Sequence, residues 1–140
     1  MFVEGQLLRF NCFSFKNGAQ PKAKYFLVLR RIGAELVMAS LPTSKDHVPD
    51  SGSKTGCINI PERCLSAFVF AAGDKVNDSF AFPLRTFIYG EQVDEYSEFY
   101  LTSMSGGYDD LGLLNESLFF DLCECLKQSS VIKRKYARLL

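Results

Sequence analysis

The chain has 140 residues, of which 47% are hydrophobic, and this is enough apolar material for one domain with a single core. Its 16 basic and 16 acidic side chains cancel, which excludes a global positive field that would steer the protein to nucleic acid or to an anionic membrane. No apolar stretch approaches the roughly 20 residues that a membrane-spanning helix needs, and the first ten residues lack the basic and then apolar layout of a signal peptide. The sequence therefore predicts a cytoplasmic protein with no membrane partner, and any contact with RNA has to be local.

The first half of the chain is predicted to be rich in strands. Residues 5–13 alternate between apolar and polar side chains, as a half-buried strand does. Residues 25–31 and 35–41 are apolar runs of strand length on either side of Gly33, and this predicts a hairpin. Strands of this length and spacing are typical of a small barrel. Further short strands are predicted at residues 56–60, 66–70, 79–82 and 85–90.

The last fifty residues have a different character. The acidic residues 91–112 are predicted to be a connection, and Asn115 is a candidate N-cap for a helix with Leu118, Leu122, Cys125 and Leu126 on one face. Phe120 projects from the polar face of that helix, either toward a partner or as an ordinary exposed aromatic. We expect a single domain, residues 1–140, with a β-barrel core at 1–90, a connection at 91–112 and a C-terminal helical segment at 113–140.

The five cysteines, at positions 12, 57, 64, 123 and 125, are an odd number in a chain without an export signal. This pattern favours reduced thiols over a disulfide framework. Cys123 and Cys125 point about 200° apart on a helix, since each residue turns about 100°, so they do not share a metal ion. Buried apolar thiols are the simpler interpretation.

Several chemical groups converge at the open end of the predicted hairpin. Lys24 comes just before the first hairpin strand and Thr43 just after the second, so the two residues are expected to be neighbours in space. The residues around them resemble the recurring pattern of the PemK/MazF family, which are toxins of toxin-antitoxin systems. The resemblance lies in Gly5-Gln6-Leu7-Leu8, Lys24-Tyr25, Leu27-Val28-Leu29, Leu41-Pro42-Thr43-Ser44 and residues 79–90.

The resemblance implies a mainly β fold with a C-terminal helix, built as an SH3-like small barrel. It also implies a homodimer, an antitoxin-like protein partner, and cleavage of single-stranded RNA without a metal or another cofactor. Lys24 stands where the family has an arginine that stabilises the phosphate, and Thr43 would take the place of the family's hydroxyl donor. Lysine offers a point charge without the planar fork of arginine, so it aligns a phosphate less strictly.

The proton transfers of such a reaction need an acid and a base near the phosphate. His47 and Asp46 are the nearby groups of suitable type, since a histidine titrates close to neutral pH. Each has a simpler explanation, because His47 can be a solvated loop residue and Asp46 can form a turn. The candidate substrate-binding residues are Ser44, Lys45, Lys22 and Arg85.

Two hypotheses from different classes remain open at this point. The first is a metal-independent endoribonuclease of the PemK/MazF type, and the segment that carries Thr43, Lys45, Asp46 and His47 favours it. The second is a non-catalytic β-barrel that binds a peptide partner or nucleic acid. The zero net charge and the lysine at position 24 favour the second hypothesis.

Overall fold

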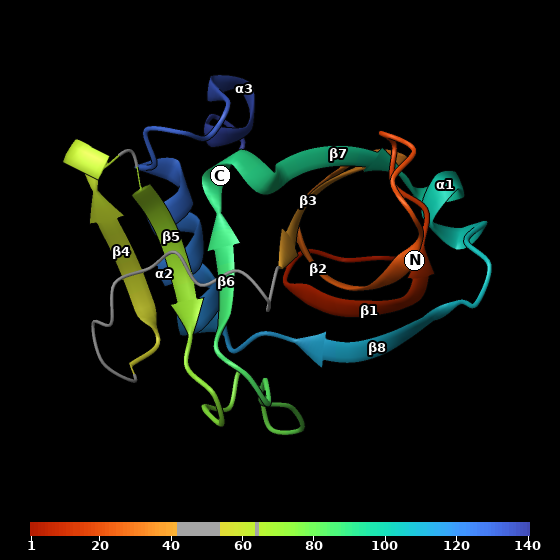
Figure 1. The fold of residues 1–140 in the computed structure, drawn as a ribbon, viewed down its shortest axis with the longest axis horizontal. Coiled ribbons are helices and arrows are strands. Elements are labelled where there is room, and N and C mark those ends of the chain that lie inside the picture. The colour runs from red at the N-terminus through yellow and green to blue at the C-terminus, as the bar shows by residue number, and fades with distance from the viewer. Residues whose placement is uncertain (42–53, 64) are drawn as a thin grey trace.

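The computed structural model describes residues 1–41, 54–63 and 65–140 (Figure 1). In these ranges the fold is mainly β, with two antiparallel sheets followed by a helix near the C-terminus, and this confirms the predicted fold class at that level. No helix in the described ranges is long and apolar enough to cross a membrane.

The larger sheet has five strands in the order β7, β3, β2, β1, β8. The bounds are β1 Gln6–Phe13, β2 Lys22–Ile32, β3 Glu35–Leu41, β7 Val93–Ser97 and β8 Tyr108–Leu113. The sheet curves strongly, and β7 and β8 form its two edges (Figure 1). Residues 91–112, predicted to be a connection, therefore supply nearly all of both edge strands, with the short helix α1 (Glu98–Thr102) between them.

The smaller sheet contains β4 (Gly56–Ile60), β5 (Leu65–Phe70) and β6 (Thr86–Tyr89), with β5 in the centre. The short helical turns η1 (Pro61–Arg63) and η2 (Gly90–Gln92) follow β4 and β6. The predicted strand at residues 79–82 is absent from the described structure, where this region has one isolated bridge between Lys75 and Ala81. The described strands thus pair as two sheets rather than as one closed barrel.

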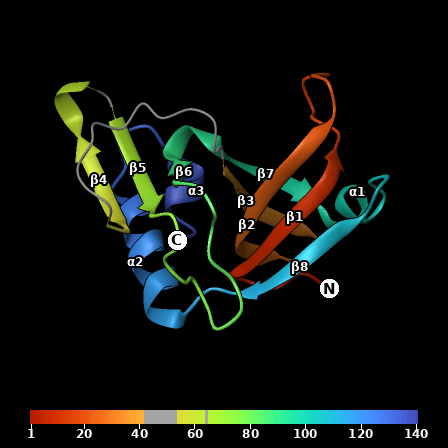
Figure 2. The same ribbon diagram turned by 60° about the horizontal axis from the view of Figure 1, so that its bottom comes forward.

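Helix α2 (Glu116–Lys127) packs on the smaller sheet, and α3 (Arg134–Ala137) follows it (Figure 2). Leu122, Cys125 and Leu126 are buried and Leu118 packs against the same core, so the predicted apolar face is confirmed. Asn115 precedes the helix, but its side chain makes no capping hydrogen bond. Phe120 is exposed, as its position on the helical wheel predicts.

Strand alternation divides the apolar side chains of the larger sheet between two clusters. Leu7 and Leu27 lie opposite each other on one face and join the main core, which also contains residues of the smaller sheet and of α2. Leu8 and Phe26 lie on the other face, in a second cluster with Leu101 of α1. The central strands are therefore covered on both faces, which explains why residues 25–29 are a continuous apolar run.

Two of the cysteines form a disulfide bond, Cys57 with Cys125, and join β4 to α2. This corrects the prediction that all five thiols are reduced. The odd number of cysteines argues only against pairing all of them, and it does not exclude one bond between residues 68 positions apart. Cys12 and Cys123 are free thiols, and Cys123 is buried as predicted.

Candidate anion-binding pocket

A pocket of about 350 Å³ lies where β2 begins and β3 ends, beside the middle of β1 in the larger sheet. Its walls come from β1, from the first residues of β2, from the last residue of β3 and from the segment that precedes β6. The lining residues are Arg9, Lys22, Ala23, Lys24, Tyr25, Leu41, Pro83 and Leu84. The pocket therefore lies at the open end of the β2–β3 hairpin, where the sequence predicts the site.

The strand register explains one wall of this pocket. Tyr25 in β2 lies directly opposite Arg9 in β1 and directly opposite Leu41 in β3. Directly opposite residues of antiparallel strands project to the same face of the sheet. Arg9, Tyr25 and Leu41 therefore form a row across three strands on one face.

The two lysines of the pocket, Lys22 and Lys24, alternate along β2 with Ala23 and Tyr25. Lys24 lies opposite Phe10, so strand alternation directs it to the other face from Tyr25. Lys24 is half-buried and Lys22 is exposed, with the ammonium of Lys22 5.9 Å from the centroid of the Phe15 ring. Both residues line the pocket because it lies at the end of the strand, where groups from both faces meet.

The wall that carries Pro83 and Leu84 is held in place from outside the pocket. The side-chain amide of Asn77 donates to the carbonyl oxygens of Leu111 and Leu113, at 3.0 Å each. Its oxygen accepts hydrogen bonds from the backbone N–H groups of Ser79 and Phe80. Asn77 thus fixes this irregular segment to the end of β8.

Aromatic packing connects the same segment to β2. The ring centroid of Tyr25 lies 6.1 Å from that of Phe80 and 5.2 Å from that of Phe82. Such contacts add to the stability gained by burial of the rings. They explain why residues 79–82 resemble a strand in sequence, since their alternating aromatic side chains enter the core although the segment forms an isolated bridge rather than a strand.

The pocket has the chemistry of an anion-binding site. Three of its lining residues carry a positive charge, and none of the described lining residues carries a negative one. The guanidinium of Arg9 donates to the side-chain oxygen of Asn11 at 2.8 Å, and the amide of Asn11 donates to the carbonyl oxygen of Gly106 at 2.8 Å. These bonds orient Arg9. A cation of fixed orientation suits a phosphate group.

The predicted site residues divide into three groups. Lys24 and Lys22 line the pocket. Arg85 follows the lining residue Leu84, but its guanidinium carbon lies 5.3 Å from the centroid of the Phe87 ring, and Arg85 is not a lining residue. Thr43, Ser44, Lys45, Asp46 and His47 lie outside the described residues. The prediction that Lys24 and Thr43 are neighbours therefore stays a prediction.

Two other arginines of β2, Arg30 and Arg31, have structural contacts away from the pocket. Arg30 donates to the carbonyl oxygens of Leu139 and Leu140, at 2.7 and 3.0 Å. Arg31 forms an ion pair with Glu98, with a shortest distance of 2.6 Å between nitrogen and oxygen. Neither residue lines the pocket.

Arg9 and Tyr25 are the site residues that sequence reasoning missed as candidates. The alternation of residues 5–13 places Arg9 on the opposite side from Leu8 and Phe10, and this was the available signal. What the sequence did not supply was the register between β1 and β2, which brings Arg9 beside Tyr25.

The strongest pKa shifts belong to groups outside the pocket. Hydrogen bonds from Arg31 and from the backbone of Phe2 lower the pKa of Glu98 to about 2. Burial raises the pKa of Tyr96 to about 12. Tyr96 lies in β7, and Glu98 begins α1, where it accepts a hydrogen bond from the backbone of Phe2. A perturbed pKa also accompanies structural ion pairs, so these shifts do not indicate a second active site.

The chain was compared with models of known protein families and with curated proteins. No family model matches it, and no curated protein matches it either.

Proposed function

We propose that the protein is an endoribonuclease of the PemK/MazF type that cleaves single-stranded RNA without a metal ion. The observation that supports this best is the pocket at the open end of the β2–β3 hairpin, where Arg9, Lys22 and Lys24 line a hollow that ends at Leu41. The chain continues from Leu41 into the segment that carries Thr43, Asp46 and His47. An SH3-like arrangement of the strands is part of the same proposal.

The proposed reaction is attack by the ribose 2′-hydroxyl on the adjacent phosphorus. A bond forms between the 2′-oxygen and phosphorus, the bond to the 5′-oxygen breaks, and the products are a 2′,3′-cyclic phosphate and a 5′-hydroxyl. Because the nucleophile is tethered to the phosphate, the enzyme has to orient and stabilise rather than supply a metal-bound nucleophile. Arg9 and Lys24 would offset the charge that grows on the phosphate oxygens, and Thr43 would donate a hydrogen bond to it.

His47 and Asp46 are the proposed proton-transfer groups. One of them would accept the proton of the 2′-hydroxyl while the other donates a proton to the leaving 5′-oxygen. Ser44, Lys45, Lys22 and Arg85 are proposed to bind the flanking phosphates, because each offers a hydrogen-bond donor or a positive charge.

The second candidate function is binding of RNA without cleavage. None of the described residues that line the pocket is a carboxylate or an imidazole, so the described part of the site can bind a phosphodiester but cannot move a proton near neutral pH. Lysine at position 24 also aligns the phosphate less strictly than arginine.

Incubation of the purified protein with a labelled single-stranded RNA in EDTA separates the two functions. The nuclease should release fragments with cyclic phosphate ends, and Lys24→Ala and Arg9→Ala should each slow cleavage about tenfold or more, a typical loss for one stabilising contact. Lys127→Ala makes the same chemical change on the exposed face of α2 and should leave the rate unchanged. Intact RNA at high protein excess, with binding that Arg9→Ala weakens, would favour the binding function.

The resemblance also carries two proposals about partners. The protein would form a homodimer, which light scattering after size-exclusion chromatography tests directly. It would also be inhibited by an antitoxin-like protein, and a short reading frame beside its own gene is the place to look for that partner.

A further inference from the structure

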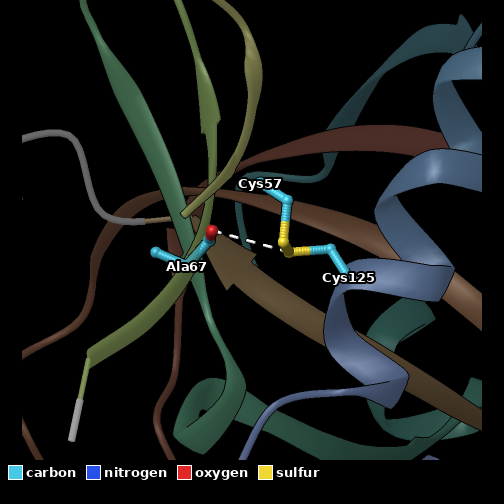
Figure 3. The surroundings of a disulfide bond; sticks show 3 residues. All are labelled: Cys57, Ala67 and Cys125. Carbon is cyan, nitrogen blue, oxygen red and sulfur yellow. Dashed lines mark hydrogen bonds between the residues drawn. A yellow bond between two sulfur atoms is a disulfide. The ribbon is translucent and has the colours of Figure 1, made fainter. Parts of the chain in front are cut away.

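The disulfide between Cys57 and Cys125 joins the outer strand of the smaller sheet to the helix that covers it (Figure 3). In the described sheet β4 pairs with β5 on one side, so β4 is an edge strand. The bond is therefore a covalent link between an edge of the sheet and the core of the molecule.

The side of β4 that faces α2 has little apolar surface. Cys57 lies directly opposite Phe68, which belongs to the main core, so Cys57 and Asn59 share that side by strand alternation. Ile58 points to the other side, where it packs against the separate cluster of Ala67, Val69, Phe87 and Tyr89. The disulfide takes the place of a hydrophobic contact between β4 and α2.

The two sulfur-bearing residues differ in exposure. Cys57 is exposed, whereas Cys125 is only 5% exposed. Both line a pocket of about 430 Å³ between β4 and α2, which is large enough to admit a small thiol. A thiolate that enters this pocket therefore meets the disulfide with the exposed residue Cys57 on one side and the buried residue Cys125 on the other.

The same pocket carries negative charge. Asp121 and Glu124 line it, and none of its ten described lining residues is cationic. Lys127 lies 3.9 Å from Glu124 as an exposed ion pair, which offsets part of that charge. The carboxylate of Asp74, which accepts a hydrogen bond from the lining residue Thr55 at 2.9 Å, adds to it.

We propose that this pocket is a thiol–disulfide exchange site that reacts at Cys57 and prefers cationic over anionic thiols. The exposure of Cys57 directs attack to that sulfur, and the carboxylates of the pocket determine which thiol is preferred.

The exchange balances without an oxidant. A thiolate forms a new S–S bond with the sulfur of Cys57, the bond between Cys57 and Cys125 breaks, and Cys125 leaves as a thiolate that takes a proton from water. The sulfur of Cys125 already lies 3.6 Å from the carbonyl oxygen of Ala67, so the new S–H group has a hydrogen-bond acceptor in place (Figure 3). Once the bond has opened, β4 is held by its ladder to β5 and by Ile58.

The test compares cysteamine, 2-mercaptoethanol and 3-mercaptopropionate, which are cationic, neutral and anionic near neutral pH. Each rate with the native protein is divided by the rate of the same thiol with the uncharged bis(2-hydroxyethyl) disulfide, which removes differences in intrinsic nucleophilicity. At low salt we expect the normalised rates to fall several-fold at each step from cation to neutral to anion, because two carboxylates line the pocket and attract a cation while they repel an anion. Acid quenching and peptide mapping should find the mixed disulfide on Cys57.

Two controls isolate the electrostatic part. The double variant Asp121→Asn/Glu124→Gln should reduce the ordering of the three thiols, whereas Asp78→Asn, an exposed carboxylate that does not line the pocket, should leave it unchanged. Salt should reduce the ordering in the unmodified protein, since exposed charges are screened within about 8 Å at physiological ionic strength. Normalised rates that are equal for the three thiols, a mixed disulfide on Cys125, or exchange only under unfolding conditions would overturn the proposal.

Discussion

At the scale of single residues, the ion pair between Arg31 and Glu98 joins three parts of the chain. The guanidinium donates two hydrogen bonds to the carboxylate, at 2.6 and 3.1 Å, and a third to the carbonyl oxygen of Phe2 at 3.0 Å. The backbone N–H of Phe2 donates to Glu98 in turn. The N-terminus, β2 and α1 therefore meet at one carboxylate.

This geometry predicts a specific dependence of stability on pH. Arg31 lowers the pKa of Glu98 from an ordinary value of 4.5 to about 2. Because the unfolded chain binds this proton more readily, the contribution of Glu98 to the free energy of unfolding is present above pH 4.5 and is lost as the pH falls toward 2. Urea denaturation of the native protein and of Glu98→Gln at several pH values should show that the difference between them shrinks across this window. A difference that is constant across it would contradict the ion pair, and the exposed Glu116→Gln variant is the control.

Substitution of two neighbouring residues at the anion-binding pocket should change the affinity for RNA in opposite directions. Arg9 lines the pocket, and Asp109 of β8 lies directly opposite Arg9 in the sheet. Arg9→Ala should weaken binding of a single-stranded RNA and reduce the slope of log K against log salt by about 0.7 if Arg9 contacts one phosphate. Asp109→Asn should strengthen binding about twofold, since it removes an exposed charge of the wrong sign. Fluorescence anisotropy over a salt series measures both changes. Weaker RNA binding by the Asp109→Asn variant would show that the RNA does not bind beside Arg9 and Asp109.

Single residues also mark the limit of sequence reasoning about the site. Lys24 was identified because it adjoins a strand that can be recognised by its apolar run. Arg9 was not, because its role depends on a register between β1 and β2 that no local pattern specifies. Local patterns predict which residues share a face of one strand, whereas the composition of a pocket depends on the pairing of several strands.

At the scale of elements, the start of η2 approaches the link between α2 and α3 closely at Gly90. A Cβ atom on Gly90 would lie 2.5 Å from the side-chain oxygen of Ser129, 3.1 Å from Cγ2 of Val131 and 3.2 Å from the backbone nitrogen of Ile132. That space is closed to any larger residue unless the helix link moves. Glycine at position 90 thus sets how closely the end of β6 packs against the C-terminal helices.

Gly90→Ala should lower the free energy of unfolding by about 1–3 kcal/mol, the usual range for overpacking. Adding Ser129→Ala removes the shortest contact, so the double variant should lose less than the sum of the two single variants. Gly56→Ala is the matched control, because a Cβ there would meet no atom within 4 Å. Urea denaturation of the native protein and of the four variants measures these changes, and full additivity would show that the contact with Ser129 is not the cause of the loss.

The elements also differ in how well the sequence predicts them. β1, β2, β3 and α2 were predicted because their side chains alternate or repeat over many residues. The edge strands β7 and β8 were missed, since they are short and rich in acidic residues, which are rare in strands. Their strand form comes from pairing with β3 and β1. Pairing over such distances in the chain is not visible in a local window.

At the scale of the whole molecule, one core connects the two sheets and the C-terminal helices. It contains Leu27 of β2, Phe68 of β5, Leu122 of α2 and Tyr136 of α3. The disulfide adds a covalent link across this core, between residues 68 positions apart in the chain. The chain order of its cysteines gave no indication of this pairing.

Reduction of this bond should lower the stability of the entire fold. Closing a loop of this length in the unfolded chain stabilises the native state by about 4 kcal/mol in the chain-entropy model. Cys57→Ser should therefore unfold at a clearly lower urea concentration than the native protein, and dithiothreitol should lower the midpoint of the native protein but not that of the variant. Cys12→Ser, which removes a free thiol, is the control. An equal effect of dithiothreitol on the native protein and on Cys57→Ser would contradict the bond.

We expect the pocket at the open end of the β2–β3 hairpin to hold an RNA phosphate. A structure of the protein with a short RNA that carries a 2′-deoxy substitution at the scissile position tests it most directly, because this RNA binds but cannot be cleaved. We expect a phosphate within hydrogen-bond distance of Arg9 or Lys24, with Thr43 and His47 beside the substituted sugar. A phosphate bound elsewhere on the protein, or a substituted sugar with no acidic or basic side chain beside its 2′-carbon, would contradict this assignment.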